Sequence, residues 1–243
     1  SIKAVLATGA RASKELMAME VHENRGAELA GRRETAQGQL SELAKQLTKK
    51  RCEAAKRLKA LVTAELAAVK MVQTAFDIAV TSDDGPEAFG PAGHDRVEFL
   101  LSSNVGEPLR PLARTASGGE LSRIMLALKT VLAETDRVPV LVFDEIDTGV
   151  GGAVAAAMGT RLRKLGAFHQ VFCITHLPQV ASQAEHHLLV EKGQDSKRTT
   201  TSVKPINGIG REEEIARMLG GATITKKVRE IAAELIAGSK GKR

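Results

Sequence analysis

The chain has 243 residues, enough for one sizeable hydrophobic core and an elongated appendage. Its composition, 43% hydrophobic and 26% charged, is typical of a soluble globular protein, and it contains neither a signal peptide nor an apolar run long enough to span a bilayer. These features argue against a secreted or membrane-embedded protein. The two cysteines, Cys52 and Cys173, lie far apart without metal-type spacing, which fits inert thiols in a reducing cytoplasm.

The net charge of +6 is concentrated at the N-terminal end of the chain. Residues 1–75 contain 14 Lys and Arg against 8 Asp and Glu, whereas residues 76–243 contain 21 of each kind. A basic segment of this kind can contact DNA phosphates without regard to base sequence. It is equally typical of a solvated helix face. Because the chain has no Trp and no Tyr, an aromatic platform for single-stranded nucleic acid is not expected.

Residues 1–78 are predicted to form a helical arm, because they lack proline and are rich in strong helix formers. From Leu29 to Phe76, apolar residues recur at spacings of three and four, which indicates a narrow coiled-coil seam. Gly26, Gly31 and Gly38 predict a bend, a frayed stretch or a turn in the upper part of this helix. One long amphipathic helix cannot bury its own stripe, so the arm is expected to need a partner helix.

Residues 79–243 are predicted to form an α/β domain with a mainly parallel sheet flanked by helices. Strands are expected near 76–80, 97–101, 140–143 and 170–174, a hairpin at 187–191 and 199–203, and helices beginning near 118, 153, 178, 211 and 225. The apolar run Val140–Phe143 suits a parallel strand that is buried on both faces. His94 falls in a turn and is expected at the surface, and the tail from Gly238 is expected to be disordered.

Polar residues follow two of the predicted strands. Asp144 and Glu145 come directly after the strand Val140–Phe143, and His176 comes just after the strand near 170–174. In open α/β sheets, ligands bind beyond the carboxyl ends of the strands, so these side chains are placed for chemistry. Upstream, Ser117, Gly118 and Gly119 precede a predicted helix. The start of that helix offers free N–H groups and a positive dipole end to an anion.

The Ser-Gly-Gly signature, the apolar strand ending in Asp-Glu and the IDTG that follows it resemble the SMC-like branch of the ATP-binding cassette ATPases. Three further stretches, NVGEPLRPL before the signature, THLPQVA from Thr175 and REEEIARMLGG from Arg211, narrow the resemblance to the bacterial family of that branch that repairs DNA double-strand breaks. The resemblance covers Val97 to Ile236. It implies an ATPase head lobe with a coiled-coil arm, working in the bacterial cytoplasm at the nucleoid.

The resemblance implies ATP and Mg²⁺ as cofactors and assigns three roles in hydrolysis. Asp144 is expected to hold Mg²⁺, Glu145 to polarise the attacking water, and His176 to sense the γ-phosphate. Phosphoryl transfer requires each of these functions. By contrast, His186 and His187 lack a comparable sequence context and are expected to be structural.

Four other residues are expected to act across a pair of heads. The resemblance implies that Ser117, Gly118 and Gly119 close on ATP bound to a second head, and that Asp147 lies in the loop between the heads. Glycines allow backbone to approach a phosphate closely, which fits this role. A plain helix cap is a fair interpretation of any serine-glycine pair, but the ELSRIMLAL that follows disfavours it here.

The sequence contains no P-loop. No stretch fits G-x-x-x-x-G-K-[ST], and the one Gly-Lys pair, Gly241-Lys242, is followed by arginine. In the resembling family that loop precedes the coil. This chain is therefore expected to be the C-terminal part of a split head, with the N-terminal P-loop half of the same protein, a second head and DNA as partners, and no membrane partner. Alone, it is expected to bind ATP weakly and to hydrolyse it negligibly.

Three alternatives remain open at this point. Another SMC-type ATPase of chromosome maintenance is disfavoured by THLPQVA and by the short coil, because chromosome condensers need far longer arms. A transporter ATPase is disfavoured because a coil replaces the helical lobe that contacts a membrane partner. A non-catalytic coiled-coil dimerisation module would tolerate Glu145→Gln, whereas an ATPase would not.

Overall fold

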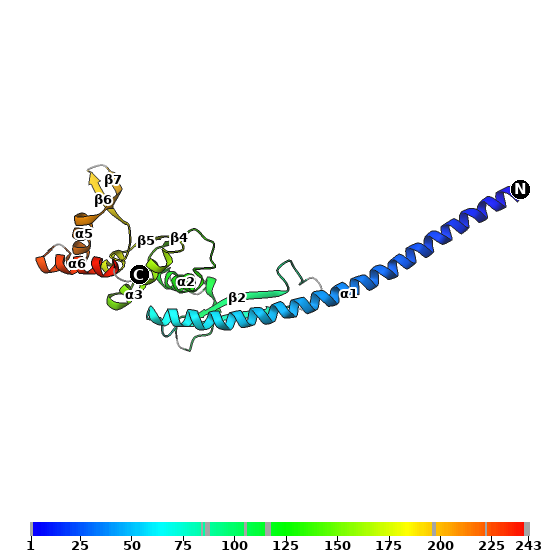
Figure 1. Cartoon of the computed structure of the whole chain (residues 1–243), viewed down its shortest axis with the longest axis horizontal. Helices are drawn as coiled ribbons and strands as arrows, with labels where there is room; N and C mark the ends of the chain where they lie inside the picture. The colour runs from blue at the N-terminus through cyan, green and yellow to red at the C-terminus, as the bar shows by residue number, and fades with distance from the viewer. Residues whose placement is uncertain are drawn as a thin grey trace. The chain divides into compact units, whose positions relative to one another are not determined.

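The computed structural model describes residues 2–83, 85, 88–104, 106–114, 118–195, 198–221 and 223–240 (Figure 1). The chain divides into two compact units. The first unit contains residues 1–55 and 80–97, and the second contains residues 56–79 and 98–243. The division therefore falls within the first helix and within the first strand pair. Among the described residues, no helix combines the length and the apolar character that a membrane crossing requires.

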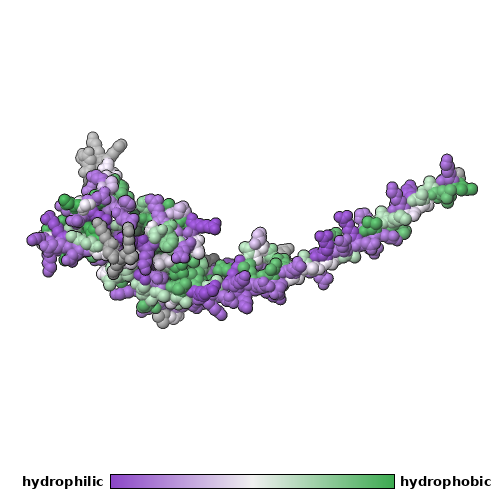
Figure 2. All heavy atoms as spheres, viewed as in Figure 1, coloured by the Kyte–Doolittle hydropathy of each residue, from purple (hydrophilic) through white to green (hydrophobic). Residues whose placement is uncertain are grey.

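The first unit is built on α1, which runs from Ile2 to Ala68. The helix passes through Gly26, Gly31 and Gly38 without a break, so no turn interrupts it there. Strong helix formers on both sides of each glycine outweigh its cost of roughly 1 kcal/mol. Many apolar side chains of α1 are exposed, and Figure 2 displays green side chains along its surface; they include Ile2, Val5, Leu6, Leu16, Met17, Leu29, Leu40 and Leu43.

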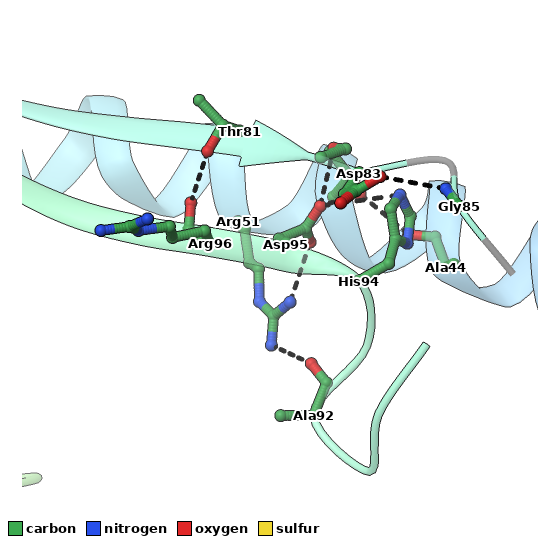
Figure 3. Close-up of polar contacts among 11 residues, drawn as sticks. Ala44, Arg51, Thr81, Asp83, Gly85, Ala92, His94, Asp95 and Arg96 are labelled. Atoms are coloured by element: carbon green, nitrogen blue, oxygen red, sulfur yellow. Dashed lines mark hydrogen bonds and ion pairs between the residues drawn. The ribbon is translucent and has the colours of Figure 1, made fainter. Parts of the chain in front are cut away.

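In the first unit, hydrogen bonds to Asp95 join the end of a strand pair to α1. The strands are β1 (Ala75–Ser82) and β2 (Asp95–Ser102), which are neighbours in one sheet. The buried carboxylate accepts hydrogen bonds from Thr48 Oγ1 at 2.6 Å, Arg51 Nη1 at 2.8 Å and Ser82 Oγ at 2.8 Å (Figure 3). Burial alone would raise its pKa, but the hydrogen bonds from Thr48, Arg51 and Ser82 outweigh burial and lower the pKa to about 2.

The loop that precedes β2 packs closely against the helix, and this corrects one expectation. The side chain of His94 is only 6% exposed, and its ring lies 5.1 Å from that of Phe89. Gly93 adopts φ +89°, and a methyl group at this position would lie 2.8 Å from Leu47 Cδ2. The prediction of a surface histidine was wrong because the local sequence does not reveal that this loop lies against α1.

The strands form three separate sheets. In the first, β2 pairs antiparallel with β3 (Arg110–Pro111). In the second, β4 (Val140–Phe143) pairs parallel with β5 (Gln170–Cys173). In the third, β6 (His187–Asp195) and β7 (Arg198–Ile206) form an antiparallel hairpin. The α/β class is confirmed, but among the described pairings the expected parallel character holds for β4 with β5 and not for β2 with β3 or β6 with β7.

The α-helices of the second unit follow the expected order. They are α2 (Gly118–Leu132), α3 (Gly152–Leu165), α4 (Pro178–Ala181), α5 (Gly208–Gly220) and α6 (Lys226–Lys240). A short 3₁₀ helix at Leu112–Arg114 precedes α2. The predicted tail disorder was wrong for Gly238–Lys240, which belongs to α6. Ser239 is buried, and its carbonyl accepts a hydrogen bond from Arg163 on α3. Residues 241–243 lie outside the described residues.

Helix α2 lies between two hydrophobic clusters. One cluster joins it to the end of α1, β1 and β2 and contains Val62, Leu66, Phe76, Leu101, Ile124, Ala127 and Leu128. The other joins it to β4 and α3 and includes Leu126, Leu141, Phe143, Ile146, Ala155 and Met158. Burial of this many large side chains, worth about 1.5–3 kcal/mol each, holds the start of α2 in place relative to the end of β4. A third cluster packs α4, α5 and α6 together.

One face of the sheet formed by β4 and β5 is uncovered. Leu141 and Phe143 are buried, but Val140 and Val142 are 43% and 66% exposed. On β5, Phe172 lies in register with Val142 and is also exposed, as is Ile174 beyond it. The prediction that β4 is buried on both faces was therefore wrong, because no described element covers this side. Val140, Val142, Phe172 and Ile174 are called the open face below.

Candidate functional site

The candidate site lies at the carboxyl ends of β4 and β5. Because the two strands are parallel neighbours, both chains leave the sheet at the same edge. The N–H of Ile174 donates to the carbonyl of Phe143 at 2.9 Å, which extends the pairing to the last residue of β4. Asp144 and Thr175 are therefore the first residues beyond adjacent strand ends. The polar residues that follow β4 and β5 therefore leave the sheet at one edge, as expected for parallel neighbours.

Asp144 and Glu145 are both exposed. Asp144 Oδ1 accepts the N–H of Glu145 at 2.9 Å. Glu145 adopts φ +55°, a left-handed conformation that is uncommon for residues other than glycine. A backbone of this kind costs of order 1 kcal/mol or more; Lys70, with φ +57°, is the other such residue in the described part of the chain. The chain therefore turns sharply after β4.

That turn brings Glu145 against the first turn of α2. A methyl group at Gly118 would lie 2.7 Å from Glu145 Oε2, and one at Gly119 would lie 2.9 Å from the Glu145 carbonyl oxygen. The two glycines therefore leave the space that Glu145 fills. Ser117, the first residue of the predicted signature, lies outside the described residues.

Two residues of α2 that the motif analysis missed hold the loop after β4. Ser122 Oγ donates to the carbonyl of Asp144 at 2.9 Å. Arg123 Nη1 donates to the carbonyls of Ile146 at 3.4 Å and Thr148 at 3.1 Å. Burial lowers the pKa of Arg123, partly offset by Glu120. The sequence did carry a signal: both residues lie one helical turn after Gly119, on a helix whose start was already singled out.

Asp147 and His176 are brought together at the end of β5. Asp147 is buried, and its Oδ2 accepts hydrogen bonds from Thr175 Oγ1 at 2.6 Å and from the His176 N–H at 3.0 Å. The same oxygen lies 3.1 Å from His176 Nδ1, whereas the imidazole is 73% exposed. Asp147 thus faces the interior of its own chain. Thr175, whose hydroxyl also accepts the N–H of Leu177, was missed because threonine after a strand is common.

The thiol of Cys173, the last residue of β5, lies close to these acids. Burial, and then the negative charges of Asp147 and Asp144, raise its pKa to about 12. A thiol with this pKa stays protonated at neutral pH and is a poor nucleophile. The expectation that Cys173 is inert therefore fits its surroundings.

The resemblance implies that an Mg²⁺ ion at this edge would be held by Asp144. Within the described ranges, no three His, Cys, Asp or Glu side chains are grouped so that they could hold a metal ion. Mg²⁺ is usually held by one or two carboxylates together with waters and nucleotide phosphates. The exposed Asp144, with one oxygen engaged by a backbone N–H, fits that arrangement.

The relatives named below are all DNA repair proteins. No protein-family model matches the chain. The DNA repair protein RecN of Streptomyces coelicolor is 44% identical over 220 residues, which cover 87% of this chain and 38% of that protein. RecN of Treponema pallidum is 44% identical, covering 81% and 35%, and RecN of Rickettsia conorii is 41% identical, covering 95% and 42%.

Among solved structures, the Smc head domain with a coiled coil and joint from Pyrococcus yayanosii is 16% identical. It aligns with a TM-score of 0.46 over 79% of this chain and 30% of that one. The RecN proteins named above are much more similar to this chain in sequence, at 41% to 44% identity. The chain spans between 35% and 42% of the length of the relatives named above. With more than 40% identity over most of its own length, the chain belongs to the RecN family.

Proposed function

We propose that this chain is the C-terminal part of an ATPase head that works in the repair of DNA double-strand breaks. ATP would clamp two such heads together, and hydrolysis would release them. The observation that carries the proposal is the edge formed by β4 and β5, where Asp144 and Glu145 leave one strand and Thr175 and His176 leave its parallel neighbour. The names of the relatives supply the repair context.

Three side chains divide the chemistry. Asp144 would bind Mg²⁺ through one carboxylate, and the ion would neutralise charge on the phosphates of ATP. Glu145 would orient and polarise the attacking water. Its position against α2 and its left-handed backbone hold the carboxylate beyond the strand end. His176, with Nδ1 turned to Asp147, would offer Nε2 to the γ-phosphate.

The open face supports a missing half as the first partner. Val142 and Phe172 lie in register, are exposed to 66% and 43%, and form an apolar surface on a strand pair that would normally be covered on both sides. The sequence has no P-loop, and the relatives are more than twice as long as the matched segment. An N-terminal half that carries the P-loop would extend the sheet and bury this face.

A second head is the next partner. The start of α2 would close on ATP held by that head, with Gly118 and Gly119 allowing close approach of the backbone. Asp147 is proposed to act from within its own chain, through His176, while the neighbouring loop residues contact the second head. The complete site would then need two copies of the protein.

The arm is proposed to contact duplex DNA without base specificity. At 100° per residue, five exposed cations of α1 fall within an arc of about 80°; they are Lys3, Arg11, Lys14, Arg25 and Arg32. Near the N-terminus, apolar Ile2, Val5, Leu6, Leu16 and Met17 fall outside this arc, whereas the exposed Val21 and Leu29 fall within it. A partner helix on the apolar side of residues 2–17 would leave Lys3, Arg11 and Lys14 for phosphates. This role would put the protein at the nucleoid, in the bacterial cytoplasm.

Replacing Glu145 by glutamine in the full-length protein tests the proposal. We expect ATP turnover to fall by about a hundredfold or more while nucleotide binding persists, because the change removes a base and preserves shape. Glu191→Gln, on the β6–β7 hairpin, is the matched control and should leave turnover unchanged. Unchanged turnover in Glu145→Gln would instead support the alternative, a coiled-coil dimerisation module. Another SMC-type role would be indicated if turnover were lost but cells repaired double-strand breaks normally.

A further inference from the structure

We propose that Arg123 is a positioning residue for His176, acting through the loop Ile146–Thr148 and the carboxylate of Asp147. This inference rests on the proposed ATPase function and adds a connection within one chain, from the second turn of α2 to the end of β5. No motif comparison assigned Arg123 any role. The connection has three steps, each with a measured contact.

The first step joins Arg123 to the loop. Its Nη1 donates to the carbonyls of Ile146 and Thr148, the residues on either side of Asp147. A guanidinium that bonds both flanking carbonyls fixes the peptide planes around the residue between them. Gly119 contributes to the fit, because a methyl group there would lie 3.3 Å from Thr148 Cβ and 3.5 Å from Arg123 Nη1.

The second step is the burial of Asp147. Asp147 lies between Ile146 and Thr148, whose carbonyls Arg123 bonds, and it is only 3% exposed. Its Oδ2 accepts hydrogen bonds from Thr175 Oγ1 and from the His176 N–H. Ile146 is fully buried in the cluster beneath α2 and β4. The loop therefore has little freedom to move the carboxylate away from β5. A shift of Arg123 would change where this carboxylate lies.

The third step fixes the ring of His176. Its Nδ1 lies 3.1 Å from Asp147 Oδ2, and the side chain is otherwise largely exposed. A carboxylate this close to one ring nitrogen favours one orientation of the ring. Nε2 is then the ring atom available to a ligand. Because misplacing a catalytic group by about 1 Å can cost a hundredfold in rate, the connection has a measurable consequence.

A double-mutant cycle in the full-length protein tests the connection. Arg123→Met keeps the length of the side chain and removes its donors. We expect kcat to fall by about tenfold to a hundredfold with KM changed less than about twofold, because ground-state binding of ATP is not altered. In a His176→Ala background, the same change should have almost no further effect. Asp147→Asn should behave in the same way, and Arg123→Lys should recover part of the rate.

Arg161→Met is the matched control, because Arg161 is also partly buried but pairs with Glu65 at 2.5 Å, away from the loop. Its effect on kcat should be small and should add fully to that of His176→Ala. The inference is overturned if Arg123→Met leaves kcat intact, or if its loss adds fully to that of His176→Ala. If Arg123→Met does not fold, the cycle of Arg123→Lys with His176→Ala decides by the same criterion. Absence of ATP turnover in the wild-type full-length protein would overturn the proposed function itself.

Discussion

The carboxylate of Glu145 lies so close to the start of α2 that a side chain at position 118 would have to displace it. A methyl group there would lie 2.7 Å from Oε2. The neighbouring Gly119 meets the backbone of the same residue, at 2.9 Å from its carbonyl oxygen. The two glycines thus face different parts of Glu145, a flexible side chain and a rigid backbone.

This difference predicts that the two alanine substitutions affect different properties of the full-length protein. Gly118→Ala should displace the exposed Glu145 side chain, so ATP turnover falls while the melting temperature changes little. Gly119→Ala requires a backbone shift and should cost about 1–3 kcal/mol of stability. Gly210→Ala, on α5 with no neighbouring atom within 4 Å, serves as the control and should leave ATP turnover unchanged without lowering the melting temperature. Equal melting temperatures for Gly118→Ala and Gly119→Ala would contradict this geometry.

Acid should loosen the contact between Asp95 and α1. Its pKa is lowered from 3.8 to about 2, so the folded state favours the ionised form. The stabilisation, of order 2 kcal/mol, is therefore fully present above about pH 4 and is lost as the pH falls towards 2. Asp95→Asn should increase hydrogen exchange of residues 88–95 at pH 7, and the difference from wild type should shrink below pH 4. Asp83→Asn, in an exposed turn, should have no such effect.

The open face should be required for association with the N-terminal half. Val142→Asp places a charge on an exposed position, so the chain itself should remain folded. Burying that charge beneath a partner costs several kcal/mol, which predicts that co-purification with a separately expressed N-terminal half is lost. Val203→Asp, 59% exposed on β7, should leave co-purification unchanged. Retained association in Val142→Asp would show that another surface carries the contact.

Arg211 should be a stability determinant of the short helix α4. Its Nη2 donates to the carbonyls of Ser182 at 3.0 Å and Ala184 at 2.6 Å, just beyond the end of α4. Burial, and then the charge of Arg163, lower its pKa. Removing a donor from these carbonyls should cost about 2–4 kcal/mol in Arg211→Met, measured by thermal unfolding. Arg217→Met breaks a more exposed pair with Glu214 and should cost less than about 1 kcal/mol.

Local patterns were sufficient to predict most elements of the second unit. The apolar run Val140–Phe143 and the helix formers after Gly119 specify β4 and α2 almost to the residue, because their periods are strong and their ends are marked by acids or glycines. The family followed from motifs such as THLPQVA, and the relatives confirm it. The parallel character expected for the strand Val140–Phe143 holds in its pairing with β5.

Contacts between distant segments were not predictable. Nothing near His94 in the sequence indicates that Leu47 and Thr48 lie beside its loop, and the exposure of Val142 depends on a covering layer that the local pattern implied but this chain does not supply. The contacts of Asp147 were not predicted for the same reason, because its partners Thr175 and His176 follow a different strand. The roles of Arg123 and Ser122 depend on which backbone carbonyls lie within hydrogen-bond distance of their side chains, and the sequence does not show this.

The left-handed backbone of Glu145 means that the residue best for protein stability at this position differs from the residue best for ATP hydrolysis. Glycine tolerates φ +55° without the penalty that glutamate incurs, so Glu145→Gly should yield a sturdier protein that no longer hydrolyses ATP. A library of variants sorted by cellular protein level would enrich glycine at this position. The same library sorted by survival after DNA breakage would remove it, and position 145 would separate the two screens.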